Sequence, residues 1–214
     1  MMMLVSAPLA DVVNAYPETS AVLTHFNVVV GQTSSLATAL NFSDVSRSDC
    51  LDQLRQALSD SACKSYRTAS VGKLVDAIVK RFHEPHRAQM PGLINDARYI
   101  EKRFAQHPAC PQGLTALLIA FFDDLIGHMD QEELFLFPAL AAAESFTMFS
   151  QLAIAHHSHD RHLNFLNSLR EKTNNFKAPN DASAAWHGLY ERLLEFYLQL
   201  NIHIAIENHF LLES

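Results

Sequence analysis

GHMDQEE (residues 127–133) places a histidine and a glutamate four positions apart, and IHIAIEN (202–208) repeats this spacing. Side chains at positions i and i+4 of a helix project from the same face. Two further segments, RFHEPHR (81–87) and HHSHDRH (156–162), are rich in histidine. Four helices packed together can direct such groups into one interior and bind metal there. The spaced pairs are His128 with Glu132 and His203 with Glu207.

Composition limits the classes of protein to which this chain can belong. With 214 residues, 49% of them hydrophobic, the chain can bury one substantial core and carry a smaller appendage. A formal net charge of -7 without clustered Lys and Arg argues against nucleic-acid binding. The first residues lack a basic signal-peptide region and no run of about 18 apolar residues occurs, so we expect no membrane association.

The cysteines indicate a reducing environment. Cys50, Cys63 and Cys110 are widely separated and odd in number, which is typical of free thiols and not of a disulfide framework or a zinc knuckle. We therefore predict a cytoplasmic protein.

The distribution of helix-breaking and turn-forming residues predicts that the chain has two parts. Residues 1–66 contain short helical segments broken by Pro, Gly, Ser and Asp, which indicates a small N-terminal helical module. Residues 67–214 contain four long helical patterns with short connections, and sustained two-residue alternation is absent. We predict an all-α protein with an antiparallel four-helix bundle. The four patterns cover residues 70–106, 112–143, 147–173 and 182–210.

Helical phase in the second pattern points its spaced pair inward. His128 shares an apolar stripe with Phe135, and Glu132 lies at the edge of that stripe. The adjacent Glu133 lies one residue further along the helix, so its side chain is rotated about 100° further from that stripe. His128 and Glu132 are therefore predicted to face the core.

The third and fourth patterns also direct histidine inward. His203 and Glu207 share the apolar face of the last pattern, and His159 is the best placed histidine of the third. His156 and His162 lie near the margins of that third stripe. The remaining histidines are predicted to lie on the surface or at helix caps: His25, His107, His157, His187 and His209.

In the first pattern, two histidines are candidates for the inward-facing position. Its apolar stripe contains His86 more centrally than His83, so phase alone favours His86. Pro85 lacks a backbone donor and clashes with the preceding turn, so a kink or π-bulge there could rotate the phase. Both histidines remain possible on these grounds.

Buried carboxylates among these histidines require a compensating cation. An ionised carboxylate in a helical core costs several kcal/mol (on the order of 2–5) unless it is paired or bound to metal. Neutral imidazoles with bridging carboxylates suit iron or manganese, whereas a structural zinc site more often includes thiolate. Asp124, one turn before His128, could orient a ligand imidazole, or it could simply cap or bind water.

Several motifs resemble one known family. They are RFHEPHRAQMPGL (81–93), HMDQEELFLFP (128–138), HDRH (159–162) and HIAIEN (203–208). They are similar to the repair-of-iron-centres family of haemerythrin-like di-iron proteins, which includes NorA-type nitric-oxide-binding proteins. The resemblance runs from about residue 8 to the end of the sequence. It implies a haemerythrin-like bundle with two non-haem irons, with manganese or zinc as less favoured metals.

The resemblance also implies a ligand set. The iron ligands would be His83, His128, His159 and His203, with Glu132 and Glu207 bridging the two ions. On this basis His83 replaces His86 as the expected ligand of the first helix.

The function implied is protection or repair of iron–sulfur centres under nitrosative and oxidative stress. Nitric oxide or oxygen would be the small ligands, and iron–sulfur proteins would be clients. A haemerythrin-type oxygen binder or sensor, or a di-iron nitric-oxide reductase or peroxidase, remain alternatives, and we expect metal-based binding and iron delivery more than catalysis. The family usually carries an adjacent Cys-Cys pair before a glycine, but here valines precede Gly31. Roles that depend on those thiols are therefore in doubt, and nitric-oxide binding gains weight.

Overall fold

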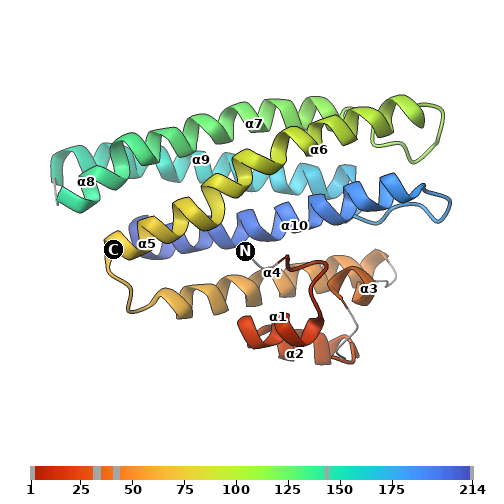
Figure 1. Ribbon diagram of the computed structural model, residues 1–214, viewed down its shortest axis with the longest axis horizontal. Helices are drawn as coiled ribbons and strands as arrows, with labels where there is room; N and C mark the ends of the chain where they lie inside the picture. Colours follow the sequence, from red (N-terminus) through yellow and green to blue (C-terminus); the bar gives the residue numbers. More distant parts are fainter. Residues whose placement is uncertain (1–2, 31–34, 41–43, 143–144, 213–214) are drawn as a thin grey trace.

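The computed structural model describes residues 3–30, 35–40, 44–142 and 145–212. Helices account for nearly all regular structure in these ranges, and the described β pairing is an isolated antiparallel bridge between Pro8 and Ser35. The predicted all-α class is confirmed (Figure 1). No helix within these ranges combines the length and the apolar character that crossing a bilayer requires.

Four long rods form the bundle, and consecutive rods run in opposite directions (Figure 1). Their ends lie within three residues of the bounds predicted from the sequence. The third rod is α9 and the other three each include a π-helical turn, η1 to η3. The rods comprise α5 (Val71–Ile78), η1 (Val79–His83) and α6 (Glu84–Arg103); α7 (Leu114–Gln131), η2 (Glu132–Leu136) and α8 (Phe137–Ala142); α9 (Ser145–Lys172); and α10 (Ala184–Glu207) and η3 (Asn208–Leu212).

Four helices precede the bundle in the part of the chain that the structure describes. They are α1 (Leu9–Ala15), α2 (Thr19–His25), α3 (Leu36–Ala39) and α4 (Asp44–Tyr66). In Figure 1, α4 lies along α10, and α1 and α2 lie beyond α4. One continuous apolar core joins these helices to the bundle. The division of the chain at residue 66 stays a prediction, although α4 ends at that residue.

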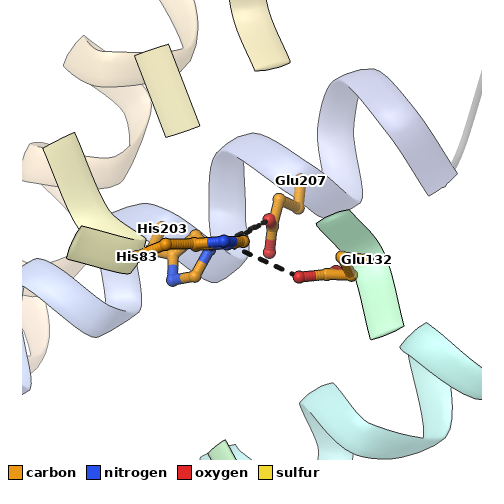
Figure 2. A group of neighbouring side chains, drawn as sticks. All are labelled: His83, Glu132, His203 and Glu207. Carbon is orange, nitrogen blue, oxygen red and sulfur yellow. Dashed lines mark hydrogen bonds and ion pairs between the residues drawn. The ribbon is translucent and has the colours of Figure 1, made fainter. Parts of the chain in front are cut away.

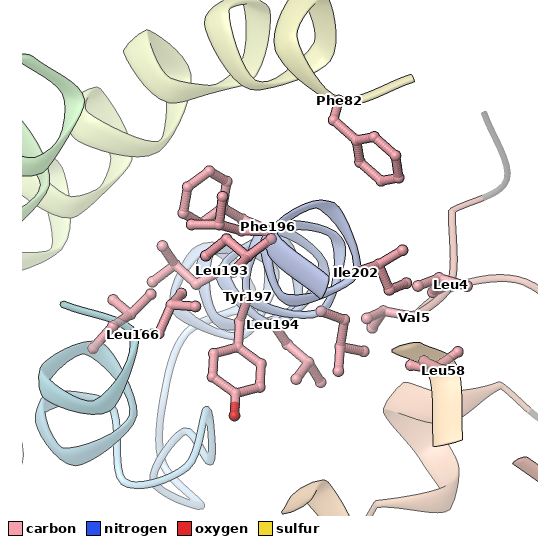
Figure 3. Close-up of a cluster of buried hydrophobic side chains, with 14 of the residues drawn as sticks. Leu4, Val5, Leu58, Phe82, Leu166, Leu193, Leu194, Phe196, Tyr197 and Ile202 are labelled. Carbon is pink, nitrogen blue, oxygen red and sulfur yellow. The ribbon is translucent and has the colours of Figure 1, made fainter. Parts of the chain in front are cut away.

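Helix α10 is the centre of this core. Every residue from 193 to 204 is buried, so the middle of the helix is covered on all sides. Figure 3 shows its side chains directed both toward Phe82 of the bundle and toward Leu4 and Leu58 of the N-terminal part. The buried Glu195 accepts hydrogen bonds from the Val5 amide (2.8 Å) and from Gln199 (2.9 Å). The N-terminal segment is thereby joined to α10 by polar as well as apolar contacts.

The π-helical turns change which residues face inward. A π turn contains one extra residue, so it rotates the side chains that follow it. The predicted kink or π-bulge beside Pro85 is confirmed by η1, which ends at His83. The prediction that Phe135 lies on the buried stripe is wrong, because η2 rotates it outward to 53% exposure and turns Leu136 inward.

The connection between α9 and α10 contains three consecutive residues with positive φ, Asn174, Asn175 and Phe176. Left-handed backbone is costly for residues other than Gly. The buried Arg47 donates to the carbonyls of Asn175 (2.7 Å) and Phe176 (3.1 Å), and also to that of Leu40. Its guanidinium therefore joins α4 to this turn.

Replacing Arg47 with Met should lower the free energy of unfolding by about 2–4 kcal/mol, because three carbonyls, two of them buried, lose a charged donor. Urea unfolding followed by circular dichroism measures the change. The exposed Arg67 supplies the matched Arg67→Met control. Equal stability of the two variants would contradict the role assigned to Arg47.

Candidate metal centre

The four rods bring six side chains together at one depth in the bundle. His83 ends η1, Glu132 begins η2, and His159 lies in the middle of α9. All six residues are 5% exposed or less. The other three are His128 on α7 and His203 and Glu207 on α10.

One half of the cluster contains His83 and His203, whose Nε2 atoms lie 3.1 Å apart. Glu207 Oε1 lies 2.9 Å from His203 Nε2 and 3.6 Å from His83 Nε2. Glu132 Oε2 lies 3.5 Å from His83 Nε2. Figure 2 shows two imidazoles and two carboxylates converging from three rods. These four groups can surround one cation.

The other half contains His128 and His159, whose Nε2 atoms are also 3.1 Å apart. Glu132 Oε1 lies 3.3 Å from His128 Nε2 and 3.9 Å from His159 Nε2. Glu207 Oε2 lies 3.2 Å from His159 Nε2. This half offers the same donor types as the first and can surround a second cation.

The two carboxylates are shared between the halves. Glu132 directs Oε2 to the first half and Oε1 to the second, and Glu207 directs Oε1 to the first and Oε2 to the second. Among the described residues none of these oxygens has a regular hydrogen-bond partner. Their ion-pair partners within the same ranges are the surrounding histidines, without Lys or Arg. The donor set therefore fits two cations bridged by two carboxylates.

Burial raises the pKa of Glu132 well above its usual range, and Glu207 and Glu133 add to that shift. Burial alone would also raise the pKa of Glu207, but His203 and His159 hold it well below its usual range. Two neighbouring buried carboxylates thus cannot both ionise without added positive charge. Divalent cations between them would supply that charge.

Two of the imidazoles around these carboxylates are held neutral. Burial lowers the pKa of His128 to about 2 and also lowers that of His203. His159 differs, because burial lowers its pKa but the adjacent Glu207 carboxylate and Asn208 outweigh this and raise it. Neutral imidazole is the form that binds metal.

The choice between His83 and His86 follows from this geometry. Both are fully buried, since residues three positions apart on a helix lie on the same side. His83 lies among the six converging groups. The His86 ring instead lies tilted beside Phe82 and edge-on to Phe196, and its Nδ1 pairs with Gln89. The structure therefore favours His83 as the candidate ligand.

Two of the imidazoles are oriented by partners behind them. His83 Nδ1 lies 2.8 Å from Glu133 Oε1, and His159 Nδ1 lies 2.7 Å from Asn208 Oδ1. Arg87 donates to the same Glu133 oxygen at 2.7 Å. Such partners fix the ring tautomer and direct Nε2 toward the metal. Phase in a regular helix turned Glu133 away from the site, and the π turn η2 explains why this prediction is wrong.

For Asp124 the sequence left two roles open, orienting a ligand imidazole or capping and binding water. Its Oδ2 lies 3.0 Å from Nε2 of the buried His162, and its Oδ1 accepts from Arg161 at 2.9 Å. It therefore contacts none of the six converging residues through these bonds. His162, which the sequence placed only at the margin of its stripe, is almost completely buried.

The histidines assigned to the surface lie there. His107 is partly exposed and faces Asp181 at 3.2 Å. The other four are exposed: His25, His157, His187 and His209.

Comparison with known proteins agrees with this arrangement. The model of the Hemerythrin HHE cation binding domain matches residues 74–213, which contain all four rods except the first three residues of α5. The chain belongs to the haemerythrin family. The family is described as cation-binding, and the converging donor groups of this haemerythrin domain agree with that description.

Three relatives of this haemerythrin-family chain carry the name iron-sulfur cluster repair protein YtfE. The protein from Dickeya chrysanthemi is 35% identical over 74% of each chain, and that from Musicola paradisiaca is 36% identical over 69% of this chain and 67% of its own length. The protein from Shigella boydii is 28% identical over 95% of this chain and 94% of its own. The predicted kinship with the repair-of-iron-centres proteins is confirmed.

Replacing Glu133 with Ala should weaken metal binding by about 10–100-fold, because His83 loses the acceptor that fixes its tautomer. A competition titration with a chromophoric chelator measures this affinity. Glu84→Ala, at an exposed position beside His83 in sequence, is the control and should bind as the parent protein does. Unchanged affinity in Glu133→Ala would show that the contact does not orient the ring.

Proposed function

We propose that this chain is a cytoplasmic non-haem di-iron protein that binds nitric oxide and protects or repairs iron–sulfur centres under nitrosative and oxidative stress. The observation that carries the proposal is the sharing of Glu132 and Glu207 between two histidine pairs. The printed name of the relatives, iron-sulfur cluster repair protein, supports the same biological role. Damaged iron–sulfur proteins would be the clients.

The donor set favours iron among the possible metals. Each half presents two imidazoles and two carboxylate oxygens, with no thiolate among the converging groups. Imidazole and carboxylate together suit iron and manganese, whereas structural zinc sites commonly include cysteine. We assign His83, His203, His128 and His159 as terminal ligands, with the two glutamates as bridges.

When bound, ferrous ions would offer open coordination positions to nitric oxide or oxygen. The chain's own residues set the conditions for that binding. Glu132 and Glu207 hold the two halves together, while Glu133 and Asn208 orient imidazoles from behind. Leu136 and Phe137, buried beside the site, limit the access of water.

Access to the cluster suits a small ligand. A crevice of about 10 Å³ reaches His128 and Glu132 between η2 and α9, where Leu136 and Ala155 line it. A space of this size is close to that of one water molecule. A larger cavity of about 370 Å³ lies beside Phe176 and away from the cluster. A diatomic ligand therefore fits the approach better than an organic substrate.

The thiols of Cys50 and Cys110 offer little to a redox role. Burial raises the pKa of Cys50 to about 11 and also raises that of Cys110. A thiol with a raised pKa is a poor nucleophile near neutral pH. Valines occupy 28–30, where the family usually has its cysteine pair, while Gly31 lies outside the described residues. Nitric-oxide capture at the metal thus has more support than thiol-linked transfer.

Anaerobic loading with ferrous ions should give two irons per chain by metal analysis. Glu132→Ala and Glu207→Ala should each lower that number, because each removes a bridge. Glu171→Ala, at an exposed position on α9, should keep both irons. Fewer than one iron in the parent protein would overturn the proposal.

Titrating the reduced, loaded protein with nitric oxide separates the functional alternatives. Stoichiometric capture without product supports binding, and steady nitrous oxide formation with an electron donor would instead identify a reductase. A stable, reversible oxygen adduct would identify an oxygen carrier.

Substituting Phe for Ala155 should slow the association of nitric oxide with the loaded protein, because the larger ring fills the crevice that reaches His128. Stopped-flow absorbance measures the rate, and metal analysis checks that both irons are retained. Ala153→Phe, at an exposed position two residues away, is the control. If both variants bind at the parental rate, ligand entry uses another route.

A further inference from the structure

A second concave region lies toward the other end of α10 from the six converging groups. It consists of two adjoining cavities, of about 370 and 280 Å³, which share part of the connection between α9 and α10. The larger one is also lined by α3 and α4, and in Figure 1 this connection lies at the end of the molecule that holds α3. Both cavities include Tyr190, about 20 Å from His203 along the helix axis. The larger cavity is within the size range of sites for small organic ligands.

Tyr190 brings a hydrogen-bond donor to the boundary between these cavities. The residue is 3% exposed, and burial raises the pKa of its hydroxyl to about 12, so the group stays protonated. Its polar neighbour is the indole of Trp186, whose N–H can only donate. The hydroxyl proton of Tyr190 therefore has no acceptor among the described residues. A buried donor of this kind requires a partner, and the cavities leave room for one.

Opposite charges border the two cavities. Glu191, exposed on α10, borders the larger one and has no ion-pair or hydrogen-bond partner in the part of the chain that the structure describes. Lys172 borders the smaller one, where its ammonium donates to the Gln112 carbonyl at 2.7 Å and keeps two further N–H donors. Lys177 borders both and adds positive charge. The Tyr190 hydroxyl thus lies where a cavity with a carboxylate meets a cavity with an ammonium.

The connection that lines both cavities has strained backbone. Asn174, Asn175 and Phe176 have consecutive positive φ values, and Arg47 holds the last two through their carbonyls. Such backbone persists only where its surroundings fix it, and it is concentrated at functional sites. The walls of the cavities are therefore formed in advance of any ligand, as in most sites for small molecules.

We propose that the two cavities bind a short zwitterionic peptide of two or three residues. Its ammonium faces Glu191, its carboxylate faces Lys172, and a backbone carbonyl between them accepts from Tyr190. An extended peptide of this length spans about 7–11 Å, which suits charges held in adjoining cavities. The site is separate from the metal centre, so the inference goes beyond the proposed function and does not depend on it.

Titration of the full, ¹⁵N-labelled chain with triglycine tests this proposal by NMR. The backbone amides of Lys177 and Asn180 report on the cavities, and the indole N–H of Trp186, the chain's only tryptophan, reports on Tyr190. We expect saturable shifts of these signals. N-acetyl-triglycine lacks the ammonium and triglycine amide lacks the carboxylate, so each should bind about tenfold more weakly than triglycine.

Two variants assign the contacts. Tyr190→Phe removes one oxygen and should weaken triglycine binding about 3–10-fold, whereas Tyr99→Phe, at an exposed position on α6, should bind as the parent protein does. Glu191→Gln should bind triglycine and its N-acetyl derivative equally, because the ammonium has lost its partner. Glu84→Gln, exposed on the same rod as Tyr99, should keep the preference for triglycine.

Two results would overturn the peptide site. One is the absence of shifts at these signals with triglycine at millimolar concentration. The other is equal binding of the three peptides by the parent protein, because the terminal charges would then make no contribution. Either result leaves the metal centre and the proposed function intact.

Discussion

The central constraint in this structure is the burial of two carboxylates without a cationic side chain beside them in the described part of the chain. Glu132 and Glu207 lie within a few ångströms of the same imidazoles, and their shared position makes full ionisation of both unfavourable. The bundle holds them there because an apolar core surrounds the site on every rod. A cation pair resolves this conflict, and the arrangement of every neighbouring group is consistent with one.

Much of this arrangement follows from sequence. The i, i+4 spacing places His128 with Glu132 and His203 with Glu207 on common faces, and the four rods follow from apolar periodicity and short connections. Periodicity could not predict which side chains face the core after each π turn. Phe135 and Glu133 were both misplaced for this reason, and His83 could not be separated from His86 by a regular helical wheel. An extra residue in a helical turn leaves no mark in composition, and only Pro85 gave a local signal.

Helix α10 determines how the N-terminal part relates to the site. Because its middle is buried on all sides, one face supplies His203 to the cluster while the opposite face packs against α4 and the first residues. Periodicity gives no direction for a helix that is apolar all round. The sequence therefore predicted the existence of a small N-terminal module and could not predict where it docks. Through α10 the module supports the same helix that carries one histidine and one bridging carboxylate.

The final helical turn, η3, reaches back into this chemistry through Asn208, whose side chain meets the ring of His159. Leu211, three residues on, is buried in the core and holds that turn in place. Residues 208–212 are thus a working part of the centre. A helix-breaking insertion within η3 would release the imidazole that this turn keeps aligned.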